Sequence, residues 1–256
     1  MRYAVKLAYD GSAFSGWQKQ PGCLTVQGVL EDAFAAFCPE KVAIQGAGRT
    51  DKGVHALGQV AHLDLPSGKP EKTVLLAANA HLPRQVRVMD VARVDSSFHA
   101  RYSALWREYV YHVWMDGACY PHVRPFVWWN GRRRWDMERI REACRHFVGK
   151  HDFSAFCRTS ERPDDAFRSI TRMTVARRGS LVRFRVRGNA FLTNMVRIMI
   201  GTLDLIGAEE CSPGIIDDLL KGADRTEAGP TAPAEGLVLQ KVGYASLSWP
   251  GRAFLR

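Results

Sequence analysis

Residues 46–56 read GAGRTDKGVHA, a glycine-rich stretch that predicts the loop between two strands of a sheet. Its central charged group places Asp51 between Arg49 and Lys52. Neighbouring cations favour the ionised form of a carboxylate, so we expect Asp51 to be charged and held in one orientation. The same pattern also fits an ordinary turn with a surface ion pair, because single short motifs have many chance matches.

The composition is typical of a globular protein that binds a polyanion. The 256 residues are 46% hydrophobic, enough for one large domain or two smaller ones. Lysine and arginine total 36 against 26 acidic residues, giving a formal net charge of +10, which favours nucleic acid as the partner. No apolar run reaches the roughly 20 residues needed to cross a bilayer, so we expect no membrane partner.

The amino terminus and the cysteines predict a cytoplasmic protein. Residues 1–10, MRYAVKLAYD, alternate as a strand does and lack the apolar run and cleavage site of a signal peptide. The six cysteines are scattered without a CxxC pair. Neither a zinc site nor a disulfide framework follows from that spacing, and reduced thiols fit the cytoplasm best.

Hydrophobic periodicity predicts a mixed α/β chain in two halves, with a boundary near residues 96–104. In the first half, Thr25 and Pro70 are suited to begin helices. In the second half, Asp136 is a predicted N-cap, and Pro213 begins a short helix. The expected strands are 3–9, 42–44, 59–65, 85–94, 104–115, 168–176, 181–187 and 235–244, and the longer helices are 26–37, 70–80, 136–148 and 191–206.

Three clusters of arginine strengthen the prediction of a polyanionic partner. On the strand LVRFRVR, residues 181–187, three arginines share one face because side chains alternate. Such a stripe suits phosphates, although a solvated sheet face would show the same pattern. The arginines of the three clusters are Arg183, Arg185 and Arg187; Arg132, Arg133 and Arg134 beside Trp128, Trp129 and Trp135; and Arg158, Arg162, Arg168 and Arg172.

Six blocks along the chain together resemble the tRNA pseudouridine synthase A (TruA) family, in the family's order. They are YDGSAFSGWQKQ at 9–20, GRTDKGVHA at 48–56, NAHLP at 79–83, FHARYSALWREYVY at 98–111, GNAFLTNMVRIMIGTL at 188–203 and AEGLVL at 234–239. The resemblance covers nearly the whole chain and is far more specific than the Asp51 loop alone.

The resemblance implies a fold and a substrate. Two similar α/β subdomains, 1–103 and 104–256, are expected, whose antiparallel sheets join into one extended mixed sheet flanked by helices. A basic active-site cleft lies between them. The family isomerises uridines 38, 39 and 40 in the anticodon arm of tRNA, works as a homodimer, and uses no cofactor or metal.

The resemblance also implies roles for five residues. Asp51 is the nucleophile, and Arg197 is the cation paired with it. Arg49 fills the space that the flipped base leaves, and Tyr109 stacks on the uracil and removes the C5 proton. Leu237 contacts the base from below. Asp51 acts on a flipped nucleotide because the reacting atoms are inaccessible within a base stack.

Some alternatives stay open. Tyr111 has the same strand parity as Tyr109, so alternation does not separate them. Whether Asp51 attacks C1′ or promotes elimination through a glycal cannot be read from the residues, and His55 fits a satisfied loop histidine better than a general base. A non-catalytic RNA-binding protein is the alternative class, because paired α/β units with aromatic and arginine-rich sheet faces also bind RNA.

Overall fold

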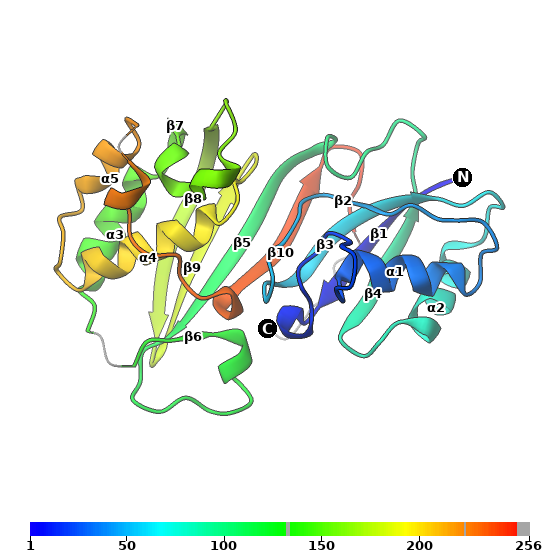
Figure 1. Ribbon diagram of the computed structural model, residues 1–256, viewed down its shortest axis with the longest axis horizontal. Helices are drawn as coiled ribbons and strands as arrows, with labels where there is room; N and C mark the ends of the chain where they lie inside the picture. Colours follow the sequence, from blue (N-terminus) through cyan, green and yellow to red (C-terminus); the bar gives the residue numbers. More distant parts are fainter. Residues whose placement is uncertain (132–133, 223, 250–256) are drawn as a thin grey trace.

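The computed structural model describes residues 1–131, 134–222 and 224–249, and Figure 1 shows them as one long sheet with helices beside both halves. The strand order is β4-β1-β3-β10-β5-β9-β8-β7, with β2 paired to β3 and β6 to β5. The strands are β1 Arg2–Tyr9, β2 Gln45–Gly46, β3 His55–Asp64, β4 Val86–Arg93, β5 Ala104–Trp114, β6 Trp128–Trp129, β7 Gly149–Asp152, β8 Phe167–Arg178, β9 Leu181–Gly188 and β10 Leu237–Tyr244. The helices are α1 Val26–Ala35, α2 Glu71–His81, α3 Met137–His146, α4 Met195–Gly207 and α5 Ile215–Leu219.

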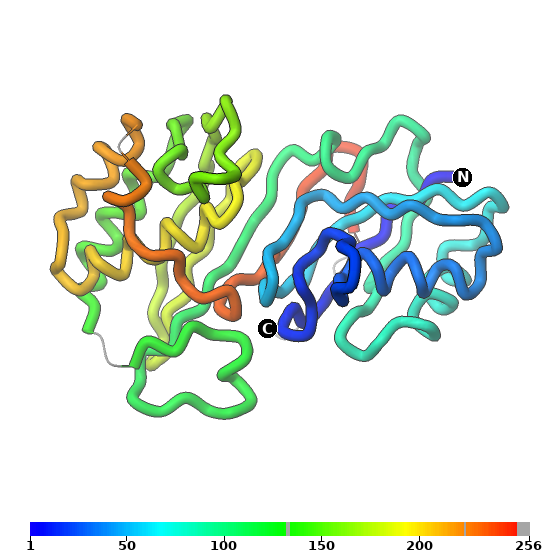
Figure 2. Tube along the Cα trace, in the orientation of Figure 1, coloured from blue at the N-terminus to red at the C-terminus, as the bar shows by residue number. Residues whose placement is uncertain are grey.

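The last strand joins the two halves of the sheet. Strand β10 pairs in parallel with β3 and antiparallel with β5, so this strand lies between the two halves. Figure 2 shows this red strand between the cyan β3 and the green β5. Parallel β3–β10 and β5–β6 pairs within a mainly antiparallel sheet make the sheet mixed. The predicted fold class is confirmed, while the boundary between 1–103 and 104–256 stays a prediction.

Two predicted helix starts are confirmed by their caps. The Thr25 side chain accepts a hydrogen bond from the Gly28 N–H at 3.2 Å, at the start of α1. The Asp136 carboxylate accepts from the N–H groups of Glu138 and Arg139 at the start of α3. Each cap satisfies backbone donors that have no partner inside the helix.

Other predicted boundaries are wrong. Helix α4 begins at Met195 rather than Phe191, because Asn194 has a left-handed backbone (φ 61°) that no helix continues through. Residues 42–44 form no strand, since only Gln45 and Gly46 reach β3. Strand β10 begins at 237 rather than 235, because a 3-10 turn occupies Ala234–Gly236.

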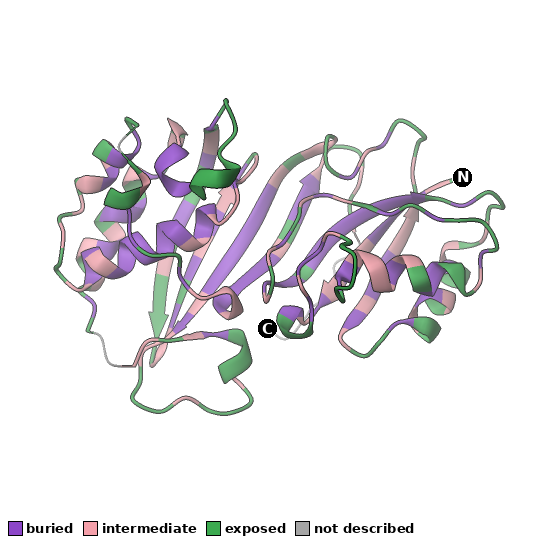
Figure 3. Ribbon diagram, viewed as in Figure 1, coloured by how far each residue is buried: buried purple, intermediate pink, exposed green. Residues whose placement is uncertain are grey.

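The core follows the strand alternation (Figure 3). On β9 the side chains of Val182, Phe184 and Val186 are buried, whereas Arg183 is exposed on the other face. Trp135, just before α3, packs edge-on against Phe184 at 5.9 Å, so this buried face is the one that the helices of the second half cover. We found no helix long and apolar enough to cross a membrane in the described ranges.

Candidate active site

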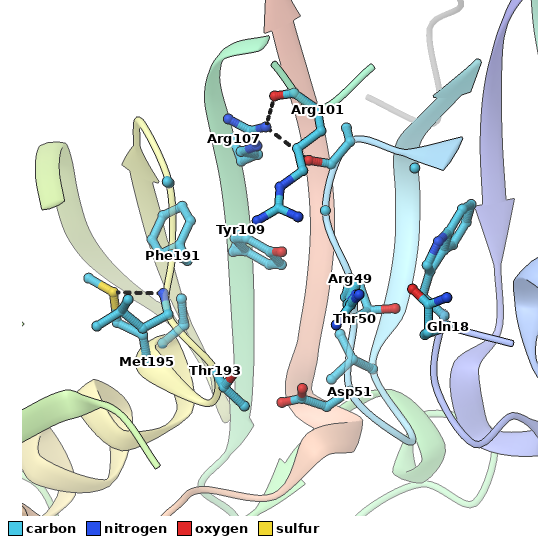
Figure 4. Close-up of a pocket in the computed structure, with 18 of the residues that line it drawn as sticks. Gln18, Arg49, Thr50, Asp51, Arg101, Arg107, Tyr109, Phe191, Thr193 and Met195 are labelled. Atoms are coloured by element: carbon cyan, nitrogen blue, oxygen red, sulfur yellow. Dashed lines mark hydrogen bonds between the residues drawn. The ribbon is translucent and has the colours of Figure 1, made fainter. Parts of the chain in front are cut away.

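A cavity of about 570 Å³ lies where the two halves of the sheet meet, and Asp51 lines it. One wall is the 46–51 loop, and the opposite wall is the connection from β9 to α4. Strand β5 contributes Arg107 and Tyr109, and β10 contributes Leu237. Figure 4 shows Phe191 and Thr193 facing the Asp51 loop across this space. Residues far apart in the sequence therefore meet around one carboxylate.

The Asp51 loop is held by hydrogen bonds from other elements. The Trp17 N–H donates to the Thr50 carbonyl oxygen at 3.0 Å, and the hydroxyl groups of Thr50 and Tyr9 lie 2.9 Å apart. The Gln59 amide donates to the Gly48 carbonyl oxygen at 2.8 Å. A loop tied at both Gly48 and Thr50 presents Asp51 in a defined orientation, which catalysis requires.

Two glycines of this loop are required by its geometry. A Cβ on Gly46 would lie 2.6 Å from the indole ring of Trp17, so no larger residue fits there without moving the ring. Gly53 has φ +82°, a left-handed conformation that side chains disfavour. The small residues of GAGRTDKGVHA thus allow the close packing and the tight turn that position Asp51.

The predicted contact between Asp51 and Arg197 is confirmed. Arg197 Nη1 lies 3.3 Å from Asp51 Oδ2 and 2.9 Å from Asn194 Oδ1, while Nε donates to the Ala232 carbonyl oxygen at 2.7 Å. The expectation that Arg49 and Lys52 hold the carboxylate is wrong, because neither forms an ion pair with Asp51 among the described residues. The cation comes instead from α4.

The structure separates the two tyrosines that strand parity leaves equivalent. Tyr109 lines the cavity, with its ring edge-on to Phe191 at 5.1 Å. Tyr111 is fully buried, and its hydroxyl group donates to the Pro233 carbonyl oxygen at 2.6 Å. Burial raises the pKa of Tyr109, and the nearby Tyr9 and Asp51 raise it further, whereas Arg107 acts in the opposite direction. Of these two tyrosines, Tyr109 is the one placed to touch a ligand in the cavity.

The remaining predicted residues also line the cavity. Leu237, at the start of β10, is buried and faces the same space as Tyr109. Arg49 is exposed there, and no described group forms an ion pair with it. The structure thus brings Arg49, Asp51, Tyr109 and Leu237 together around one cavity, with Arg197 behind the carboxylate.

The sequence interpretation missed Arg107. This buried guanidinium donates from Nη2 to the carbonyl oxygens of Ala47 (2.9 Å) and Arg101 (2.6 Å), and from Nη1 to that of Asn189 (2.7 Å). It thereby ties together three segments that line the cavity, and no described carboxylate pairs with it. Arg107 lies two residues before Tyr109 in the same strand, so the two side chains share a face, and this spacing could have identified it.

The arginine stripe of β9 does not serve this cavity. Arg185 and Arg187 lie on the sheet face opposite Tyr109, because Tyr109 pairs with Val186. Both approach the carboxylate of Glu108, which occupies part of the predicted phosphate surface. Of the third cluster, Arg168 lines the cavity. In the second cluster, residues 132 and 133 lie outside the described residues.

His55 is satisfied, as the sequence suggests, but by groups outside its own loop. Its Nδ1 accepts a hydrogen bond from the Gly11 N–H at 3.0 Å, and its Nε2 lies 3.1 Å from the Pro125 carbonyl oxygen. Burial lowers the pKa of His55, which keeps the ring neutral. In the described ranges, no group of three or more His, Cys, Asp or Glu side chains is arranged to hold a metal ion.

The chain is similar to one family of known proteins over most of its length. The tRNA pseudouridine synthase family matches residues 5–103 and 143–245. The tRNA pseudouridine synthase A of Brachyspira hyodysenteriae is 41% identical over 242 residues, covering 94% of this chain and 97% of that protein. Those of Paramagnetospirillum magneticum (41% over 246 residues, 96% of each chain) and Geobacillus kaustophilus (42% over 239 residues, 93% of this chain and 92% of that protein) are similarly related.

Proposed function

Because this chain belongs to the tRNA pseudouridine synthase family, we propose that the Asp51 cavity is where it isomerises uridine in tRNA. The chain is an isomerase that converts uridine of tRNA to pseudouridine. The observation that carries the site assignment is the Asp51–Arg197 contact at the edge of a cavity that also presents Tyr109 and Leu237. The charge of +10 suits a polyanionic substrate.

The reaction needs one carboxylate and a flipped base. The N1–C1′ bond breaks, the uracil turns within the site, and C5 bonds to C1′ while its proton moves away and N1 regains one. Asp51 either attacks C1′ or removes a sugar proton to form a glycal. In both routes the Arg197 guanidinium holds the carboxylate in its orientation through a charge-assisted contact. Arg49 fills the space that the base leaves.

Tyr109 and Leu237 hold the uracil, and Tyr109 accepts the C5 proton. The raised pKa of Tyr109 means that its hydroxyl group is protonated before reaction, so it gives that proton to N1, which needs one once the N1–C1′ bond is broken, and then accepts the proton from C5. The charge of Asp51 is one cause of that raised pKa. Loss of this charge on bonding to the nucleotide lowers the Tyr109 pKa at the stage when a base is needed.

The finer assignments belong to the same proposal. The substrate region is the anticodon arm, with uridines 38, 39 and 40 as targets, and the active species is a homodimer in the cytoplasm that needs no cofactor or metal. Their support is the block-by-block resemblance to the family, together with relatives named tRNA pseudouridine synthase A. Mapping of pseudouridine in tRNA transcripts and light scattering of the purified protein test them.

The decisive experiment measures tritium release from tRNA labelled at uridine C5, in EDTA. Wild-type protein is expected to release tritium, and Asp51→Ala to release none while still binding tRNA. Full release by Asp51→Ala contradicts the assignment of the nucleophile. Binding without release by wild-type protein would instead indicate a non-catalytic RNA-binding protein.

A further inference from the structure

The cavity continues beyond the residues that the proposed reaction uses. Figure 4 shows the Tyr109 ring between Asp51 and the Arg101 side chain, which points into the cavity from the far end. That end is lined by Gln45, His99, Arg101 and Tyr102. A uridine held between Asp51 and Tyr109 leaves this second end free for another part of the substrate.

The far end is ordered by the imidazole ring of His99. Its Nδ1 accepts hydrogen bonds from the N–H groups of Arg101 (3.2 Å) and Tyr102 (3.3 Å). Because Nδ1 accepts, Nε2 carries the proton and donates it to Gln45 Oε1 at 2.9 Å. Burial and the charges of Arg2 and Arg101 lower the pKa of His99, which favours this neutral form.

These bonds connect the far end to the catalytic loop. Gln45 lies in β2, immediately before the GAGRTD residues, and the Arg101 carbonyl oxygen accepts from Arg107 at 2.6 Å. The turn at 99–102 is therefore in place before any substrate arrives. Pre-ordering of this kind lowers the entropy lost when a ligand binds.

Tyr102 is available to stack on a planar ligand. The residue is 77% exposed, the largest value among the exposed hydrophobic residues described. The His99 ring lies 4.4 Å from the Tyr102 ring, and the Arg101 guanidinium lies 5.7 Å from the same ring. Proteins bind single-stranded nucleic acids with this combination, because a base stacks on the exposed aromatic ring and a phosphate pairs with the neighbouring arginine.

We propose that His99, Arg101 and Tyr102 form a second nucleotide subsite. In this subsite the unpaired base that neighbours the flipped uridine stacks on Tyr102, and the adjoining phosphate pairs with Arg101. Flipping one base leaves its neighbour without a stacking partner, and Tyr102 replaces that partner. The inference rests on the proposed function, because it assumes that the uridine occupies the Asp51 end.

The test is a double-mutant cycle between protein and RNA. Dissociation constants are measured for wild-type protein, Tyr102→Ala and Tyr102→Phe with anticodon-arm RNAs that each carry one abasic nucleotide in turn. With intact RNA, Tyr102→Ala weakens binding about 5- to 100-fold, and Tyr102→Phe binds as wild type does. With the abasic site next to the modified uridine, the effect of Tyr102→Ala disappears, because the stacked base is already gone.

Additive losses at every abasic position, or coupling only at positions away from the modified uridine, would overturn the subsite. Tyr120→Ala is the matched control, because Tyr120 is also exposed (61%) but lies outside the cavity lining. Its effect should be additive with the abasic site next to the modified uridine. Pseudouridine formed without coupling refutes the subsite alone, whereas coupling without pseudouridine refutes the proposed reaction.

The phosphate contact has its own measurement. Arg101→Gln should reduce the slope of log Kd against log salt by about the contribution of one phosphate contact. Arg101→Lys should keep the wild-type slope. An unchanged slope in Arg101→Gln would overturn the assignment of Arg101. Arg101 is exposed, and its side chain forms no ion pair with the described residues, so folding does not depend on its charge.

Discussion

Each face of strand β5 lies near a carboxylate that an arginine contacts, but the two carboxylates differ in how exposed they are. On the cavity face, Arg107 and Tyr109 line the same cavity as Asp51, whose side chain is 35% exposed and lies 3.3 Å from Arg197. On the other face, Glu108 accepts from both Nε (3.0 Å) and Nη2 (2.7 Å) of Arg187, and its side chain is only 5% exposed.

The difference lies in how much of each carboxylate remains available. Arg187 also stacks on Trp106 at 4.1 Å, and Arg185 approaches Glu108 at 3.8 Å, so the Glu108 carboxylate is enclosed by cations. Asp51 has a cation for orientation and remains accessible from the cavity. An accessible, oriented carboxylate suits chemistry, whereas an enclosed pair contributes to folding. Substitutions on the two faces should therefore separate turnover from stability.

Asp51→Asn should have the largest effect. It removes the only carboxylate lining the cavity in the described ranges, so kcat is expected to fall by at least about 10³-fold. Affinity for tRNA should change little, because the amide occupies the same space. Single-turnover tritium release and filter binding measure both. A variant with more than a tenth of wild-type turnover would remove Asp51 from the reaction.

Arg197→Lys should follow. Lysine keeps the charge but cannot reach Asp51, Asn194 and Ala232 at once, as the arginine does. We expect kcat to fall about 10- to 100-fold with tRNA affinity retained, since misorientation of a catalytic group is costly. The matched control is Arg187→Lys on the opposite face, which should keep wild-type kcat; equal losses in both variants would contradict the comparison.

Arg107→Lys should reduce kcat by about tenfold, because it alters the positions of the segments around the cavity. The guanidinium bonds three segments around the cavity, and an ammonium group cannot bridge all three. Because Arg107 is buried and bound to carbonyl oxygens, tRNA affinity should be unchanged. A rise in KM with wild-type kcat would mean that Arg107 instead contacts the substrate.

Glu108→Gln should affect stability rather than turnover. Glutamine in place of Glu108 leaves Arg185 and Arg187 without their shared anion. Because both arginine side chains are about one third exposed and can be solvated, the expected cost is about 1–2 kcal/mol of unfolding free energy. Urea denaturation measures that loss, and kcat per folded molecule should match wild type. A stable variant with reduced kcat would show that the opposite face also takes part in the reaction.

His112, also on that face, should make the protein sensitive to acid. Burial, with the nearby charge of Arg183, lowers the pKa of His112 from 6.5 to about 4. Because the unfolded chain binds this proton more readily, the stability present above pH 6.5 is lost as the pH falls towards 4. Between pH 7 and pH 4.5 this loss is about 2 kcal/mol. His112→Gln should reduce it in urea denaturation, whereas the exposed His122→Gln should not.

Local patterns predicted much of this molecule. Alternation identified the buried residues of β9, and the caps Thr25 and Asp136 were found from their residue type. The start of α4 was missed, because the left-handed backbone of Asn194 interrupts the helix within an apolar run that itself predicts a continuous one. The Arg107 bonds were missed because their acceptors are backbone oxygens, which carry no sequence signal.

The sequence by itself determined the strand and helix content, the basic charge, and the block-by-block family resemblance, since these depend on neighbouring residues. Only the tertiary structure decided which groups meet at Asp51. The cation in contact with Asp51 is 146 residues away rather than adjacent, and Tyr109 is distinguished from Tyr111 by what each side chain touches. The arginine stripe faces away from the cavity for the same reason: strand order sets which face meets which wall, and strand order depends on long-range pairing.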